Sequence, residues 1–94
     1  FNTENVENME SMFLNCSSLS TLNLNHFDTK KVNDMSNMFE NCSSLSELNI
    51  NNFITSNVIS MKNMFSNCIS LNSLTLNFDT KNVQNMESFI TVKI

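Results

Sequence analysis

Residues 27–52, FDTKKVNDMSNMFENCSSLSELNINN, decide the fold, because the same pattern of apolar residues recurs on both sides of this stretch. Equivalent residues lie 26 positions apart, except that the third copy is one residue shorter. We therefore divide the 94-residue chain into repeats 1–26, 27–52 and 53–77 and a partial repeat 78–94. Self-similarity at such a period is typical of a solenoid, in which each repeat stacks on its neighbours.

The apolar positions of the repeat form ladders along the sequence. All seven Met and all eight Phe fall on such positions, which indicates core packing rather than a ligand site. A single repeat buries too little apolar surface to fold alone, so we expect stability to grow with repeat number. The clearest ladders are Phe1, Phe27, Phe53 and Phe78; Met9, Met35, Met61 and Met86; Met12, Met38 and Met64; and Phe13, Phe39 and Phe65.

The first half of each repeat has helical spacing. These apolar residues fall on a stripe roughly 120° wide when placed on an α-helix, which predicts one short helix per repeat on the convex side. Thr29 or Asn33 is the expected N-cap. Asn41, like Asn15 and Asn67, is expected to adopt a left-handed conformation at the C-cap. In the second repeat the stripe consists of Val32, Met35, Met38, Phe39 and Cys42.

The second half of each repeat changes to a period of two, which predicts a short strand. In the second repeat, Leu48 and Ile50 are expected to point inward, whereas Glu47 and Asn49 point outward. Strands of successive repeats should pair in parallel.

These residues resemble the leucine-rich-repeat superfamily. The spacing recurs as Leu19-x-x-Leu22-x-Leu24, Leu45-x-x-Leu48-x-Ile50 and Leu71-x-x-Leu74-x-Leu76, and residues 27–45 as a whole are similar to the BspA-like repeats of bacterial lipoproteins and some protists. The resemblance implies an α/β solenoid, a right-handed coil with one short parallel β-strand and one short α-helix per repeat. It also implies a cell-surface or secreted protein used in adhesion or protein binding.

The chain departs from the family pattern at several positions. The family usually carries Gly where Asn15, Asn41 and Asn67 stand here. The fourth copy has Phe89 and Ile90 in place of Met-Phe, and the segment 89–94 is interpreted as a cap, a strand or a cut.

Composition excludes several classes of function. The net charge is −4 and the five basic residues, all Lys, are scattered, so we expect no nucleic-acid partner. No apolar run is long enough to span a bilayer, so we expect no direct membrane insertion of this segment. Gly and Pro are absent, and we expect the nineteen Asn residues to form the turns instead.

No residue pattern points to catalysis, a cofactor or a metal. Cys16, Cys42 and Cys68 recur once per repeat, which is compatible with a disulfide, a metal site or buried thiols; without a C-x-x-C pair, buried thiols are favoured. His26 is the only histidine and has no catalytic partner in any recognisable motif. Asn15 and Asn41 begin N-x-S sequences, which the repeat explains as helix caps rather than glycosylation sites.

The outward strand and loop positions are the candidate partner-binding surface. We expect a non-enzymatic module that binds a host or cell-surface protein; a structural spacer and an intracellular scaffold are the alternatives. We call these residues the strand face: Thr21, Asn23, Asn25, Glu47, Asn49, Asn51, Ser73, Thr75 and Asn77.

Overall fold

Two short parallel strands pair with each other in the computed structural model, which describes residues 2–91. Strand β1 (Glu47–Ile50) lies beside β2 (Ser73–Leu76), and each residue of β1 pairs with the residue 26 positions later. Leu48 and Ile50 are buried and Glu47 and Asn49 are exposed, which confirms the predicted alternation. At the position of these strands the first repeat forms an isolated bridge from Thr21 to Glu47, so the described residues contain strands in two repeats.

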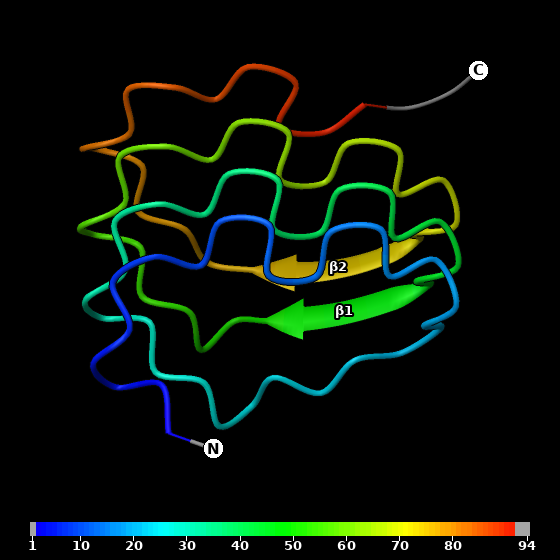
Figure 1. Ribbon diagram of the computed structural model, residues 1–94, viewed down its shortest axis with the longest axis horizontal. Helices are drawn as coiled ribbons and strands as arrows, with labels where there is room; N and C mark the ends of the chain where they lie inside the picture. Colours follow the sequence, from blue (N-terminus) through cyan, green and yellow to red (C-terminus); the bar gives the residue numbers. More distant parts are fainter. Residues whose placement is uncertain (1, 92–94) are drawn as a thin grey trace.

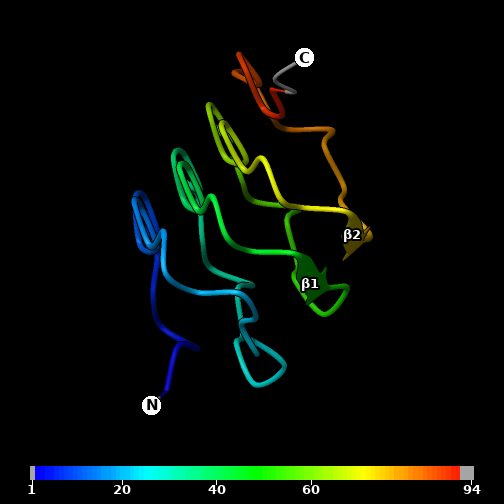
Figure 2. The same cartoon turned by 90° about the vertical axis from the view of Figure 1, so that its right-hand side faces the viewer.

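The four copies lie one above another in a compact domain that measures 33 × 29 × 20 Å. Figure 1 shows equivalent segments following parallel paths from the first copy to the fourth, and the side view in Figure 2 separates them into successive layers. Backbone hydrogen bonds join neighbouring layers, as described below. The repeat seen in the sequence is therefore also a repeat in space.

The predicted helices are wrong: residues 2–91 contain no helix. Consecutive turns occupy this segment instead, with the N–H of Met38 donating to the carbonyl of Met35 and the N–H of Cys42 donating to that of Phe39. Asn37 and Asn41 have φ angles of 62°, whereas an α-helix requires negative φ throughout. Each is the third residue of its turn, the position where a type II turn needs positive φ. The N-cap roles of Thr29 and Asn33 are consequently wrong as well.

The left-handed Asn residues are confirmed, but within turns rather than at helix C-caps. Asn15, Asn41 and Asn67 have φ between 61° and 63°. Asn is one of the few residues besides Gly that adopts this conformation readily. A second left-handed position precedes each of them by four residues, occupied by Ser11, Asn37 and Asn63.

Hydrogen bonds of the turn segment alternate between its own repeat and the next one. The N–H groups of Met35, Asn37, Phe39 and Asn41 donate to carbonyls of the third repeat at 2.7–2.9 Å. The N–H groups between them, such as those of Met38 and Glu40, close turns within the repeat. An α-helix would direct all of these bonds inside one segment. Here half of them hold neighbouring repeats together.

The core lies between the turn segments and the strands and consists of the ladder residues. Met35, Met38 and Phe39 of the second repeat have no exposed surface. The ring of Phe39 stacks between those of Phe13 and Phe65, with centroid distances of 5.5 and 5.4 Å and interplanar angles of 6° and 5°. The ladders predicted from sequence therefore form continuous columns through the domain.

The buried-ladder prediction fails in part at both end copies, where Leu19 of the first and Met86 of the fourth are exposed. Met86 is 41% exposed, whereas its counterparts Met35 and Met61 are fully buried, because no further repeat covers it within the described residues. Ile90 forms a parallel bridge with Phe65 and is 50% exposed. Of the segment 89–94, positions 92–94 lie outside the described residues.

Candidate functional site

The strand face is built from the alternate positions of β1, β2 and the equivalent part of the first repeat. All nine of its residues are exposed. The pairing of Thr21 with Glu47 and of Glu47 with Ser73 brings three of them into one row across the repeats. Asn49 and Thr75 pair in the same way. The inward neighbours Leu48 and Ile50 are buried, so the scaffold holds this row in position.

The remaining strand-face residues are not joined by pairing. Asn25, Asn51 and Asn77 lie beyond the carboxyl ends of the strand segments and are exposed. The backbone N–H of Asn25 donates to the side-chain oxygen of Asn23, and that of Asn51 donates to the side-chain oxygen of Asn49, both at 3.0 Å. These are Asx turns, which end the extended segment. The amide oxygens of Asn23 and Asn49 are thus already engaged.

A shallow polar hollow of about 270 Å³ lies on the strand face between the first and second repeats. Its walls combine the exposed side chains of Thr21, Asn23, Asn25, Glu47 and Asn49 with Leu22. Glu47 supplies the only charge in this lining. The hollow offers hydroxyl and amide groups and one carboxylate, which suits hydrogen bonding to a partner.

A second polar surface was not recognised in the sequence as a connected feature. The side-chain amide of Asn41 donates to the side-chain oxygen of Asn15 at 2.8 Å, and that of Asn67 donates to Asn41 at 2.9 Å. This asparagine ladder borders an open hollow of about 370 Å³ that Ser17, Ser43 and Ile69 complete. The sequence does contain a signal for this ladder, because Asn15, Asn41 and Asn67 lie 26 residues apart. From the sequence, these residues are predicted only to form helix caps.

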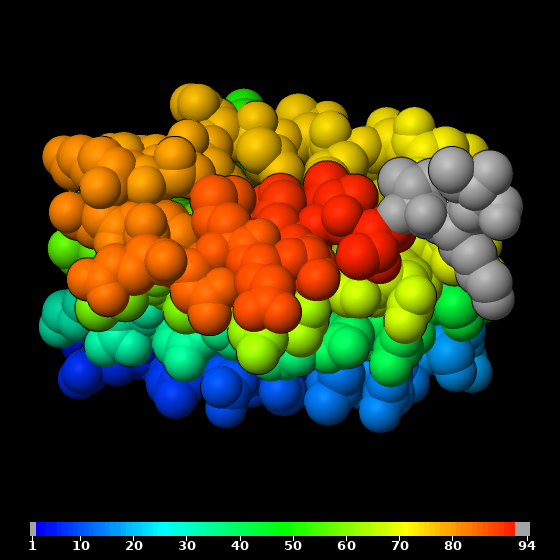
Figure 3. Space-filling model, turned by 90° about the horizontal axis from the view of Figure 1, so that it is seen from above, coloured from blue at the N-terminus to red at the C-terminus, as the bar shows by residue number. Residues whose placement is uncertain are grey.

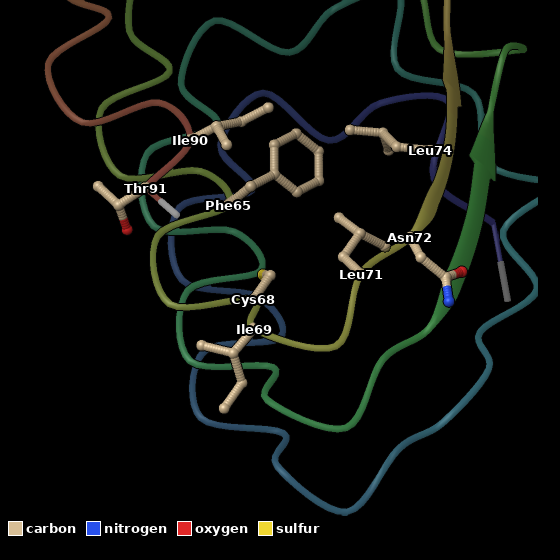
Figure 4. A pocket seen from close by; sticks show the side chains of 8 residues that line it. All are labelled: Phe65, Cys68, Ile69, Leu71, Asn72, Leu74, Ile90 and Thr91. Atoms are coloured by element: carbon tan, nitrogen blue, oxygen red, sulfur yellow. The ribbon is translucent and has the colours of Figure 1, made fainter. Parts of the chain in front are cut away.

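An apolar hollow of about 250 Å³ lies above the third repeat. Figure 4 shows Leu71 and Leu74 on one side of it, and Phe65 with Ile90 from the fourth copy beside it on the other. In the second repeat, Leu45 and Leu48 occupy the positions of Leu71 and Leu74 and are buried beneath the next layer. The hollow therefore lies where the fourth copy covers Leu71 and Leu74 less completely than the third repeat covers Leu45 and Leu48.

The three cysteines are free thiols: Cys42 and Cys68 are buried in the core, and Cys16 is half-buried against it. The Cys42 thiol donates to the carbonyl of Phe13 at 3.2 Å, and the Cys68 thiol donates to that of Phe39 at 3.0 Å. Burial, together with the neighbouring thiols, raises the pKa of Cys42 to about 11, and burial also raises the pKa of Cys68. A raised thiol pKa suppresses the nucleophilic thiolate.

Two further ionisable side chains, His26 and Asp28, lie near the start of the second repeat. His26 is exposed and lies edge-on to Phe27, with ring centroids 5.7 Å apart. The backbone N–H of Lys30 and the Lys30 ammonium lower the pKa of half-buried Asp28. Residues 2–91 contain no group of three or more His, Cys, Asp or Glu side chains placed to hold a metal ion. The same residues include no helix long and apolar enough to cross a membrane.

Fold and surface together define a compact domain of stacked repeats that presents a polar strand face. The chain belongs to the DUF285 family, described as a Mycoplasma protein of unknown function, whose sequence profile matches residues 1–93. No curated protein and no solved structure matches the chain.

Proposed function

We propose that the chain is part of a right-handed leucine-rich-repeat solenoid of the BspA-like kind, and that its strand face binds a protein partner. The 26-residue offset between paired strands supports the solenoid, as do the hydrogen bonds at three successive repeat junctions. Leucine-rich repeats combine a strand with a helix or a 3₁₀ segment. In this chain consecutive turns take that place.

One observation carries the binding proposal: the first row of the strand face differs from repeat to repeat, while the inward neighbours stay apolar and the row of Asn25, Asn51 and Asn77 stays constant. Thr21, Glu47 and Ser73 occupy one row and differ in size and charge. A fixed scaffold with a variable exposed row is the arrangement that solenoids use for recognition. The polar hollow beside Glu47 gives such a partner a place to form hydrogen bonds.

The proposed activity is binding, without catalysis, cofactor or metal. The partner is a host or cell-surface protein, and the proposed location is the cell surface or the secreted fraction, both from the family resemblance. The net charge of −4 supports a protein rather than a nucleic acid as the partner. A structural spacer is the second candidate, because Asn23 and Asn49 use their side-chain oxygens in local turns.

The test measures attachment of beads coated with the chain to cultured mammalian cells, with and without protease treatment of the cells. The variant Glu47→Lys combined with Thr75→Arg changes charge and size in the middle of the strand face. Glu10→Lys is the matched control, since Glu10 is exposed on the turn segment. We expect protease-sensitive attachment that the double variant lowers by about tenfold or more, the equivalent of roughly 1.4 kcal/mol.

The control should attach like the unmodified chain. Attachment that survives the double variant would favour the spacer and contradict recognition by the strand face. Attachment no greater than that of uncoated beads would contradict adhesion itself.

A further inference from the structure

Glu47 is the only charged residue among the nine of the strand face, and it lies inside the stack, in the second repeat. Its backbone pairs with Thr21 of the first repeat and with Ser73 of the third. Pairing in register places all three side chains on one face, so the exposed carboxylate lies between two hydroxyl groups. Neighbouring strands are about 4.8 Å apart, which allows one bound group to contact the carboxylate and both hydroxyls.

No Lys residue in the described part of the chain forms an ion pair with Glu47. Lys30 and Lys81 pair with Asp28 and Asp79 instead, at 3.3 and 3.8 Å. In Figure 3 strand β2, drawn in gold, lies along one edge of the molecule, and the turn segments of the first three repeats, from blue to light green, lie along the opposite edge. The strand side is thus a separate surface, on which a partner can supply the positive charge that complements Glu47.

Side-chain amide donors lie beside the carboxylate. Asn49 follows Glu47 by two residues on the same face of β1, and its side-chain oxygen accepts the N–H of Asn51. Its amide nitrogen donates to no group of the described residues, and the same holds for Asn23. Both amides border the polar hollow of about 270 Å³, together with Glu47 and Thr21. The hollow therefore combines a carboxylate with hydroxyl groups and amide donors that are free to bind a partner.

A guanidinium group fits this arrangement better than an ammonium group does. Two parallel N–H groups of an arginine bind both oxygens of a carboxylate, and three further N–H groups of the same planar group are left to donate. The hydroxyl oxygens of Thr21 and Ser73, on either side of Glu47, are placed to accept from them. A lysine ammonium directs its three donors from a single nitrogen and forms no such fork.

We propose that the protein partner of the strand face presents an arginine side chain to Glu47. The guanidinium pairs with the carboxylate and donates to the hydroxyls of Thr21 and Ser73. A backbone carbonyl of the partner accepts from the side-chain amide of Asn49. This inference rests on the proposed function and adds the chemistry of the group that is recognised.

Titration of the isotope-labelled chain with Nα-acetyl-arginine amide, followed by NMR at constant ionic strength, tests the chemistry at Glu47. Nα-acetyl-lysine amide is the matched probe with the same charge. Both titrations extend to about 200 mM, because a single exposed ion pair is weak. We expect the backbone amide signals of Thr21, Glu47 and Ser73 to shift. The affinity for the arginine compound should be at least about threefold higher, because only the guanidinium forms the bidentate pair.

Glu47→Gln removes the charge and nearly keeps the size of the side chain, so the preference for the arginine compound should disappear. Glu10→Gln is the matched control, because Glu10 is exposed on the turn segment, and it should bind like the unmodified chain. Circular dichroism verifies that both variants remain folded. Equal affinities of the unmodified chain for the two compounds would overturn the proposal, as would undiminished arginine binding in Glu47→Gln.

Attachment of coated beads to cells separates this inference from the proposed function. Phenylglyoxal modifies arginine side chains of the cell-surface proteins, and acetylation of their lysines is the control treatment. We expect the first treatment to lower attachment by about tenfold or more and the second to leave it within about twofold. Attachment that survives arginine modification would overturn the inference and leave binding by the strand face intact. Absence of attachment to untreated cells would contradict the proposed function, and the titration then decides the chemistry at Glu47 by itself.

Discussion

At the scale of single residues, buried threonines connect neighbouring repeats. The hydroxyl of Thr29 donates to the carbonyl of Ile54 at 2.9 Å and accepts from the N–H of the same residue at 2.8 Å. Thr3 and Thr55 make the corresponding pairs of bonds with Asp28 and Asp79. One side chain thus satisfies two backbone groups of the next repeat, which would otherwise be buried without partners.

Replacing Thr29 with Val should destabilise the domain. Val has nearly the same shape, so the change removes the hydroxyl and leaves the N–H and carbonyl of Ile54 without their partner. We expect a loss of about 2 kcal/mol in the free energy of unfolding, measured by urea denaturation. Thr75→Val, on the exposed strand face, should change stability by less than about 0.5 kcal/mol. Equal stabilities of the two variants would contradict the role of Thr29.

The raised pKa of Cys42 predicts a pH dependence. The folded state favours the neutral thiol, because its pKa is about 11 when folded and 9.0 in the unperturbed thiol. The stabilisation from this group is present below about pH 9 and is lost as the pH rises through about 11. Unfolding measured across this range should show a smaller decline for Cys42→Ala than for the wild type. Identical declines would show that Cys42 ionises normally in the folded protein.

At the scale of elements, the turn segment depends on residues that tolerate positive φ. Each complete turn segment contains two left-handed residues four positions apart, such as Asn63 and Asn67 in the third repeat. Between them the chain alternates between bonds to its own turn and bonds to the neighbouring repeat. The segment is therefore a series of turns that follows the junction between two repeats, and it is not a helix.

Substitutions at Asn63 distinguish this segment from a helix by the sign of their effect. Asn63 has a φ of 57°. Asn63→Ala should lower the free energy of unfolding by about 1 kcal/mol, and Asn63→Gly should leave it nearly unchanged. In an α-helix the order is reversed, because Ala is the best helix former and Gly one of the worst. Urea denaturation measures the free energy of unfolding of both variants. If Asn63→Ala is more stable than Asn63→Gly, the segment does not consist of these turns.

The sequence predicted the strands and core columns but not the turns. Polar and apolar residues alternate in residues 47–50. In a strand this pattern places all apolar side chains on one face, so the pattern predicts a strand with one buried face. The stripe from Val32 to Cys42 is compatible with a helix and also with turns that bury the same side chains. The distinguishing signal was a further Asn in the second and third repeats, at positions 37 and 63, whose left-handed conformation a helix cannot include; Ser11 has this conformation in the first repeat.

The residues of the strand face could be predicted in part, again from the alternation of apolar and polar residues. Alternation identifies outward residues such as Glu47 and Thr75, which are exposed and paired in rows with their neighbours. It does not reveal that Asn23 and Asn49 bond to the backbone two residues later. The asparagine ladder along Asn15, Asn41 and Asn67 escaped prediction because it depends on contacts between repeats.

At the scale of the whole molecule, burial depends on position in the stack. Leu45 of the second repeat is 1% exposed, whereas its counterpart Leu19 in the first repeat is 37% exposed. Residues of the inner layers are covered from both sides and those of the end layers from one. Stability should therefore reside mainly in the second and third repeats.

Paired substitutions of methionine by aspartate test this distribution. Met38→Asp places a charge among fully buried side chains, so we expect loss of the folded state or a destabilisation of several kcal/mol. Met86→Asp, at the exposed end, should lower the free energy of unfolding by less than about 1 kcal/mol. Circular dichroism and thermal melting at low protein concentration measure both effects. Similar melting of the two variants would contradict the layered core.

The central claim is that backbone hydrogen bonds of the turn segment join successive repeats. NMR couplings across hydrogen bonds between an amide nitrogen and a carbonyl carbon test it most directly. The N–H of Phe39 donates to the carbonyl of Met64 at 2.9 Å, so the spectrum should connect the nitrogen of Phe39 with the carbonyl carbon of Met64. A connection to the carbonyl carbon of Met35, four residues earlier, would indicate an α-helix and contradict the account.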